Sequence, residues 1–126
     1  MLNNKSEEID FYNLRIKKKY GQNFLVDKNI IKKIVSAVDI KKDDIIIEIG
    51  AGLGALTQYF LCAKKIIAIE IDGDLIGVLQ KKFDTNKNFE LINGDILKLN
   101  LEKITHDYKN IKIVSNLPYY ISTAII

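Results

Sequence analysis

The chain has 126 residues, of which 48% are hydrophobic and 28% charged, and this composition predicts one globular domain rather than a disordered chain. No apolar run approaches the roughly 18 residues of a membrane span, and no signal peptide follows Met1, so we expect a cytoplasmic protein. One cysteine, Cys62, and one histidine, His106, exclude an internal disulfide and a cysteine/histidine metal site, and we expect no metal.

Positive charge is concentrated near the N-terminus. The formal net charge is +3, and the first 42 residues hold ten Lys or Arg against five acidic residues. Residues 1–20 are polar and weakly periodic, which predicts a basic N-terminal arm. Its basic cluster would suit an RNA phosphate backbone, although a solvated surface run explains the same residues. The candidate RNA-binding residues are Arg15, Lys17, Lys18 and Lys19.

Helices and strands alternate along the rest of the chain. A helix follows Asp27, its predicted N-cap, and carries an apolar stripe at spacings of three and four. The alternation predicts an α/β fold with a parallel, doubly wound sheet. The stripe consists of Ile30, Ile31, Ile34, Val35 and Val38. The other predicted elements are strands over 44–49, 66–70, 89–93 and 111–116, and helices over 55–63, 73–83 and 101–106.

The sequence reaches Ile126 soon after the fourth predicted strand. Ser122 and Thr123 could cap a further helix there. A parallel sheet that ended at the fourth strand would leave an unprotected edge. We therefore expect an N-terminal fragment of a longer protein, with the sheet truncated after the fourth strand.

A glycine-rich turn between the first strand and the next helix is the first candidate binding element. Gly50, Gly52 and Ala55 fit the GxGxxA dinucleotide fingerprint, and Glu70, 20 residues beyond Gly50, could accept the ribose hydroxyls of NAD. Gly54 instead completes the GxGxG loop of S-adenosylmethionine-dependent methyltransferases. A turn without any ligand is the third possibility, and the loop alone does not decide among them.

Polar residues lie at the end of each of the other predicted strands. Glu70, Asp95 and Asn116 would lie with the glycines at the carboxyl ends of the strands, where doubly wound sheets bind ligands. Asp95 could accept a hydrogen bond from an adenine amine, or could simply be a turn residue. Before the first helix, the amides of Gln22 and Asn23 are also candidate ligand contacts.

Residues 116–119 are the most specific signal in the chain. Asn116 offers an amide oxygen, Leu117 a carbonyl, Pro118 a rigid turn and Tyr119 an aromatic face. The exocyclic amine of adenine is a poor nucleophile because its lone pair is delocalised into the ring. Hydrogen bonds from that amine to Asn116 and Leu117, with the base stacked on Tyr119, would make it reactive toward a methyl donor.

Together these motifs closely resemble the ribosomal RNA adenine dimethyltransferases, and the form of the first and last motifs is similar to the small-subunit branch of that family. The resemblance covers residues 18–126. It is carried by residues 18–25 (KKYGQNFL), 48–57 (EIGAGLGALT), 69–72 (IEID), 94–95 (GD) and 116–123 (NLPYYIST).

The resemblance implies a Rossmann-like fold and S-adenosylmethionine-dependent N6,N6-dimethylation of two adjacent adenosines near the 3′ end of small-subunit rRNA, during ribosome biogenesis. The partner would be the immature small ribosomal subunit. Residues 21–126 would be the N-terminal part of the catalytic domain, inactive without its remainder and a helical C-terminal domain. The cofactor-binding candidates are Gln22, Asn23, Leu25, Gly50, Gly52, Gly54, Glu70, Asp95 and Asn116; the catalytic candidates are Asn116, Leu117, Pro118 and Tyr119.

Two other functions fit the same residues. One is an RNA-binding ribosome-assembly module whose cofactor site is vestigial. The other is a large-subunit rRNA adenine methyltransferase of the macrolide-resistance type. Methyl incorporation into immature small subunits would distinguish the assembly module from the methyltransferase, because only the methyltransferase would transfer methyl groups.

Overall fold

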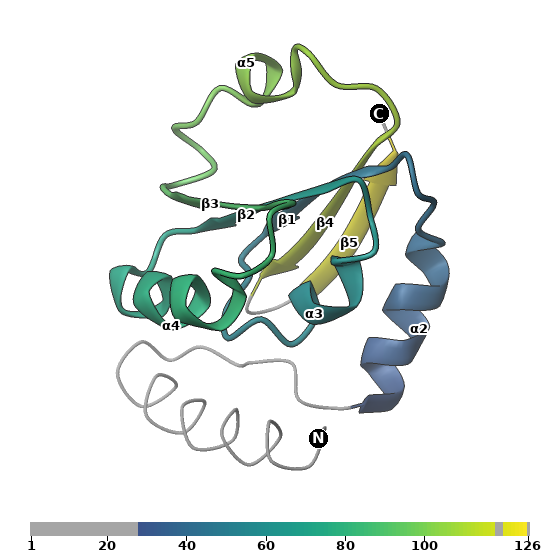
Figure 1. Cartoon of the computed structure of the whole chain (residues 1–126), viewed down its shortest axis with the longest axis horizontal. Coiled ribbons are helices and arrows are strands. Elements are labelled where there is room, and N and C mark those ends of the chain that lie inside the picture. The colour runs from purple at the N-terminus through teal and green to yellow at the C-terminus, as the bar shows by residue number, and fades with distance from the viewer. Residues whose placement is uncertain (1–27, 118–119, 126) are drawn as a thin grey trace.

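The computed structural model describes residues 28–117 and 120–125, and for residues 116, 117 and 120–125 it describes the backbone only. From residue 28 to residue 117 helices and strands alternate as expected, and a further strand follows (Figure 1). In chain order they are α2 (Lys28–Val38), β1 (Ile45–Ile49), α3 (Thr57–Phe60), β2 (Lys65–Glu70), α4 (Gly73–Phe83), β3 (Phe89–Asn93), α5 (Leu101–Thr105), β4 (Ile111–Leu117) and β5 (Tyr120–Ile125).

The strands form one sheet in the order β3-β2-β1-β4-β5. β1 pairs in parallel with β2 on one side and with β4 on the other, and β2 pairs in parallel with β3. The chain therefore builds outward from β1 to β3 and then crosses back to β4. This reversal makes the β1/β4 boundary the switch point of a doubly wound sheet, and the predicted fold class is confirmed.

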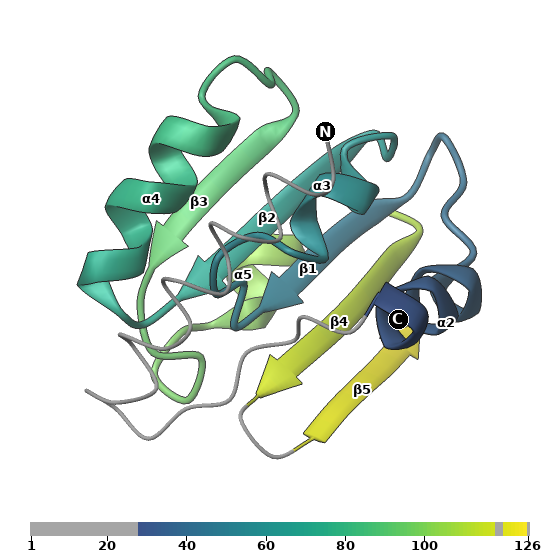
Figure 2. The ribbon, with the colours of Figure 1, turned by 90° about the horizontal axis from the view of Figure 1, so that it is seen from below.

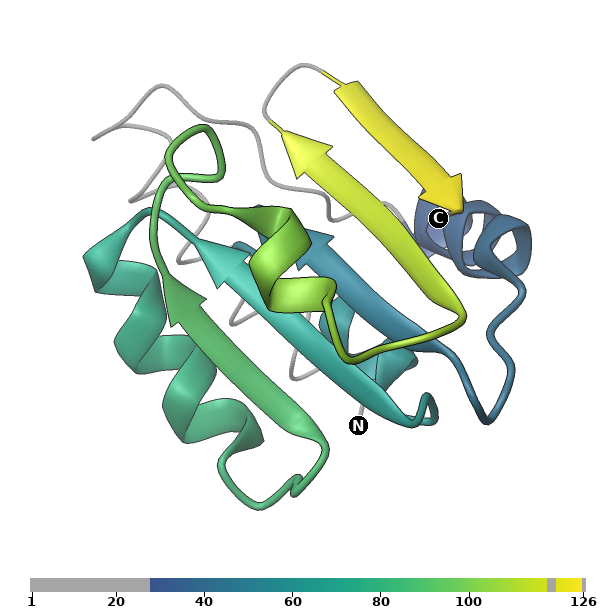
Figure 3. The same ribbon diagram turned by 90° about the horizontal axis from the view of Figure 1, so that it is seen from above.

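Both faces of the sheet are covered. α2, α3 and α4 lie on one face, seen from below in Figure 2. α5 and the segments beside it lie on the other, seen from above in Figure 3. Since β1 and β2 are buried on both faces, they read as continuous apolar runs rather than as alternating ones. No helix within the described ranges is long and apolar enough to cross a membrane.

Two helices differ from expectation. α3 has four residues, because residues 51–56 form the turns of the glycine loop and Leu56 occupies the N-cap without a side-chain hydrogen bond. In α2, Ile31 and Val38 are buried but Ile30 is 42% exposed. Figure 2 shows α2 at the margin of the sheet, so only part of its apolar stripe meets the core.

The segment after Leu117 differs most. Residues 120–125 do not begin a helix capped by Ser122 or Thr123; they form β5, antiparallel to β4. The sheet therefore continues past the fourth strand, and β5 covers the edge that β4 would otherwise expose. β-branched residues at 121, 123 and 125 favour the extended conformation.

Gly54 is the glycine at which a side chain should be most harmful. Its φ is +86°, and an added Cβ would lie 2.7 Å from a ring carbon of Phe83. We expect Gly54→Ala to lower the free energy of unfolding by about 2 kcal/mol or more, measured by urea denaturation. Gly77→Ala is the matched control: Gly77 lies in α4 with nothing within 4 Å of its added Cβ, so stability should rise by about 0.5–1 kcal/mol. Equal stability of Gly54→Ala and the unaltered chain would contradict the prediction.

Candidate functional site

A cavity of about 400 Å³ lies at the carboxyl ends of β1, β2 and β3. It brings together three of the predicted site residues, Gly50, Glu70 and Asp95, from three different strand ends. The remaining lining is mostly apolar. The complete lining is Ile49, Gly50, Ile69, Glu70, Ile71, Gly94, Asp95, Ile96 and Leu97.

The glycine loop leaves β1 with three residues in the left-handed region. Gly50, Gly52 and Gly54 have φ values of 77°, 61° and 86°. The Gly50 amide donates to the Ile69 carbonyl of β2 at 2.8 Å, so the loop turns away while still attached to the sheet. A side chain would be strained at all three positions, and glycine also lets the backbone form the cavity wall directly.

Glu70 joins this loop to the cavity. One carboxylate oxygen accepts from the Gly52 amide at 2.8 Å, and the other accepts from the Asp72 amide at 3.0 Å. The residue is 5% exposed. Burial raises the pKa of Glu70 and the nearby charge of Asp72 adds to the rise, while the backbone amides of Asp72, Gly52 and Ile71 oppose it. Each carboxylate oxygen has a further lone pair, so Glu70 can accept two more hydrogen bonds from a ligand.

Asp95 lies across the cavity from the glycine loop, after β3. Its Oδ1 accepts from the Leu97 amide at 3.0 Å, which is the turn role that the sequence allowed. No hydrogen bond to Oδ2 occurs within the described part of the chain, so this oxygen is available to a ligand. Gly94, just before it, is tied to β2 because its amide donates to the Glu70 carbonyl at 3.1 Å.

Apolar side chains at the cavity were missed by the sequence analysis. Ile71 is 61% exposed and Leu97 is 90% exposed, although both are large and hydrophobic. In the sequence, Ile71 directly follows Glu70, and Leu97 comes two residues after Asp95. This closeness to an acidic residue at a strand end is the one sequence feature that could have indicated them. An apolar wall beside two carboxylates suits a flat aromatic ring with hydroxyl and amine donors at its edges.

Glu48 does not line the cavity, but it is a buried ionisable residue next to the glycine loop that the sequence analysis did not single out. It is fully buried in β1, accepts a hydrogen bond from the Thr57 hydroxyl of α3, and its Oε2 has no partner among the described residues. Burial, reinforced by the nearby charge of Glu70 and opposed by the Thr57 hydrogen bond, raises the pKa of Glu48 to about 8. Glu48 is therefore mostly protonated at neutral pH, directly beneath the glycine loop. A charged residue inside a run of isoleucines was the signal.

The other predicted residues are only partly placed. Asn116 follows Ser115, which pairs with Ile49 at the end of β1, so the Asn116 backbone lies at the same end of the sheet as the cavity. The side chains of Asn116 and Leu117 are not described. Nine further candidates lie outside the described residues: Arg15, Lys17, Lys18, Lys19, Gln22, Asn23, Leu25, Pro118 and Tyr119.

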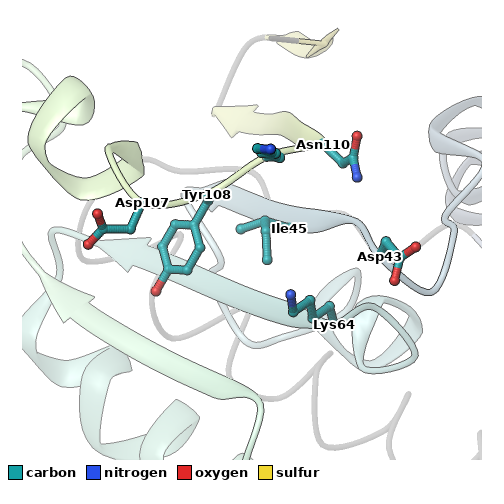
Figure 4. Close-up of a pocket in the computed structure, with 7 residues that line it drawn as sticks. Asp43, Ile45, Lys64, Asp107, Tyr108 and Asn110 are labelled. Carbon is teal, nitrogen blue, oxygen red and sulfur yellow. The ribbon is translucent and has the colours of Figure 1, made fainter.

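A second hollow, of about 280 Å³, lies at the opposite end of the strands (Figure 4). Tyr108 and Ile45 form part of its surface, with Lys64 and Asp43 on the far side. Its exposed charges have both signs, and none of the predicted site residues contributes to it. Among the described residues no cluster of three His, Cys, Asp or Glu could hold a metal ion. The cavity at the carboxyl ends is therefore the candidate site.

The geometry of the helix after the glycine loop distinguishes between the two candidate cofactors, a dinucleotide such as NAD and S-adenosylmethionine. A dinucleotide fold places the diphosphate at the N-terminus of the helix that follows the glycine loop. Here α3 has only four residues, and its first residue, Thr57, is buried against Glu48. This arrangement favours a ligand without a diphosphate.

Comparisons with known proteins identify the family of the chain. The family model described as "Ribosomal RNA adenine dimethylase" matches residues 13–126. A curated relative from Clostridium perfringens, "Ribosomal RNA small subunit methyltransferase A", is 45% identical over 121 residues, which are 95% of this chain and 42% of the relative. The chain thus spans less than half the length of that relative.

Solved structures show the same fold. A dimethyladenosine transferase from Plasmodium falciparum superposes with a TM-score of 0.58 and 29% identity, over 71% of this chain and 42% of that one. The 23S rRNA methyltransferase ErmE has a TM-score of 0.59 and 24% identity, over 75% of this chain and 48% of that one.

Proposed function

The chain belongs to the ribosomal RNA adenine dimethylase family, and from this premise we propose that it is the cofactor-binding part of an S-adenosylmethionine-dependent rRNA methyltransferase. Its reaction is the N6,N6-dimethylation of two adjacent adenosines near the 3′ end of small-subunit rRNA, on the immature small ribosomal subunit in the cytoplasm. The name of the 45% identical relative supports the small-subunit substrate. Residues 1–20 are proposed as an RNA-binding arm and 21–126 as the N-terminal part of the catalytic domain.

One observation carries the proposal: Glu70 and Asp95 lie in one cavity beside the glycine loop. Glu70 accepts hydrogen bonds from the two ribose hydroxyls of the cofactor, and the free Oδ2 of Asp95 accepts from its adenine amine. Ile71, Ile96 and Leu97 provide the apolar surface for the purine ring. Gly50 lies at the cavity wall, and Gly52 and Gly54 shape the loop beside it.

The bound cofactor supplies an electrophilic methyl group on a sulfonium. The Asn116 amide oxygen and the Leu117 carbonyl accept hydrogen bonds from the target amine, which localises its lone pair toward the methyl group. The proposal also includes two residues outside the described ranges: Tyr119 would stack on the extruded adenine, and Pro118 would restrict the backbone next to it. The target nitrogen would gain the methyl group as the bond from that methyl to the sulfonium sulfur breaks, S-adenosylhomocysteine would leave, and the amine would release one proton to water. The second methylation would need a second cofactor molecule, and the single N–H that remains would donate to one of the two acceptors. No covalent bond to the protein is needed.

The large-subunit alternative is less well supported, because identity to ErmE is 24% against 45% to the small-subunit relative. A vestigial cofactor site is also less well supported, because two of the polar side chains expected to hold the cofactor, Glu70 and Asp95, line an open cavity.

Calorimetric titration of the chain tests the proposed function. We expect saturable binding of S-adenosylhomocysteine, the product form of the cofactor, and no binding of NADH. The reason is that the cavity offers carboxylates and an apolar wall but no extended helix N-terminus for a diphosphate. Binding of NADH without binding of S-adenosylhomocysteine would contradict the proposal and indicate a dehydrogenase. Binding of neither would favour the RNA-binding assembly module with a vestigial cofactor site.

A further inference from the structure

The glycine loop is crossed by a continuous series of hydrogen bonds that begins at a carboxylate. The Glu70 carboxylate accepts from the Gly52 amide at 2.8 Å. The carbonyl of that same peptide unit belongs to Ala51, and it accepts from the Gly54 amide at 3.0 Å. In a trans peptide the N–H and C=O point in opposite directions, so the second bond continues the line of the first.

The series ends at an ammonium. The peptide unit that contains the Gly54 amide has the Leu53 carbonyl at its other end, and this carbonyl accepts from the Lys82 side chain of α4 at 3.0 Å. Two peptide units, 51–52 and 53–54, therefore link Glu70 to Lys82. We call this series the loop relay: Glu70, the two peptide units and Lys82.

All the dipoles of the loop relay are aligned. Each N–H points toward the carboxylate end and each C=O toward the ammonium end, which is the favourable orientation for both charges. Hydrogen bonds in such a row polarise and strengthen one another in a partly buried setting. Gly54 has no room for a side chain against Phe83, so the second peptide unit is also confined by packing on α4.

We propose that Lys82 is a positioning residue for the candidate cofactor site, acting through the loop relay on the Gly52 amide and on Glu70. This inference rests on the proposed function for its ligand, but not for its geometry. Lys82 does not line the cavity, so its effect on a ligand has to pass through the loop. The sequence offers no sign of this role, because Lys82 is one of two consecutive lysines at the end of a helix.

Amide hydrogen exchange tests the loop relay without any ligand. In Lys82→Met, we expect exchange at Gly54 and Gly52 to become about fivefold faster or more, as loss of one charged hydrogen bond implies. Gly50 is the internal reference, since its amide donates to Ile69 outside the relay. Lys82→Arg should restore protection, and Lys81→Met, at the exposed neighbouring lysine, should change nothing. Unchanged exchange at both relay amides would overturn the proposal.

Titration with S-adenosylhomocysteine tests the effect on binding. Lys82→Met should weaken binding about fivefold, Lys82→Arg should bind like the unaltered chain, and Lys82→Met added to Glu70→Gln should cost less than it does alone. Equal affinity of Lys82→Met and the unaltered chain would refute the positioning role while leaving the proposed function intact. If the unaltered chain does not bind, the proposed function fails, and the exchange experiment still decides whether the relay exists.

Discussion

Replacing Glu70 by glutamine should weaken the binding of S-adenosylhomocysteine about 100-fold or more. The carboxylate is proposed to accept both ribose hydroxyls, and a hydrogen bond to a charged group contributes about 1.5–3 kcal/mol. Two such bonds correspond to at least about 3 kcal/mol, hence about two orders of magnitude in the dissociation constant. Glutamine retains the shape of the side chain but presents an NH₂ donor where an acceptor is needed.

The pH profile of binding gives an independent readout for Glu70. Burial raises the pKa of this carboxyl, so affinity should fall as the pH drops through that raised pKa and the group becomes protonated. In Glu70→Gln the part of this acid-side loss that comes from Glu70 should be absent, so the pH dependence of affinity should be weaker than in the unaltered chain. Glu102→Gln, at an exposed position on α5, is the control and should bind with unchanged affinity. Strong binding by a folded Glu70→Gln would remove Glu70 from the site.

Replacing Glu48 by glutamine should make the protein more stable at alkaline pH. The folded chain keeps the Glu48 proton up to a pKa of about 8, whereas the unfolded chain releases it near the ordinary value of 4.5. Between these values the folded state binds more protons, so its stability falls as the pH rises, by up to about 1.4 kcal/mol per pH unit. The contribution of the protonated Glu48 side chain to the free energy of unfolding is fully present below pH 4.5. It decreases as the pH rises and is lost once the pH passes 8.

Glutamine imitates the protonated acid at every pH and can still accept from Thr57. We therefore expect the unfolding free energies of Glu48→Gln and the unaltered chain to be similar at pH 5 and to diverge in favour of the variant toward pH 8, measured by urea denaturation. Glu90→Gln, at an exposed β3 glutamate that pairs with Lys65 at 3.3 Å, should show the same change of stability with pH as the unaltered chain, because the residue is not buried. If the free energies of unfolding of Glu48→Gln and the unaltered chain depend on pH in the same way, Glu48 is not protonated in the folded state at neutral pH.

Several elements were predictable because local signals were strong. β3 and α4 have the predicted bounds, and the structure adds that Asp72 is the N-cap of α4, since its side chain accepts from the Asp74 amide. Apolar runs broken by glycine or acidic residues mark such strands without any tertiary information. The placement of Glu70 and Asp95 in one cavity follows as well, since the carboxyl ends of parallel strands meet at one edge.

Other features depend on neighbours that are distant in the sequence. α3 is short because the turns of residues 51–56, with Gly54 against Phe83 of α4, come before it. Residues 120–125 form a strand because β4 offers an open edge. Likewise, whether Ile30 is buried depends on where α2 meets the sheet rather than on the spacing of its apolar residues.

The sequence by itself therefore determined the order of the elements, the glycine loop and the acidic residues at the strand ends, because each is encoded within a few consecutive residues. Tertiary structure alone decided that Glu48 is buried against Thr57 and that Lys82 contacts the Leu53 carbonyl. The reason is physical: the pKa of a carboxyl and the partner of an ammonium depend on desolvation and on distance in space, and pairs 9 and 29 residues apart carry no local pattern that reveals either.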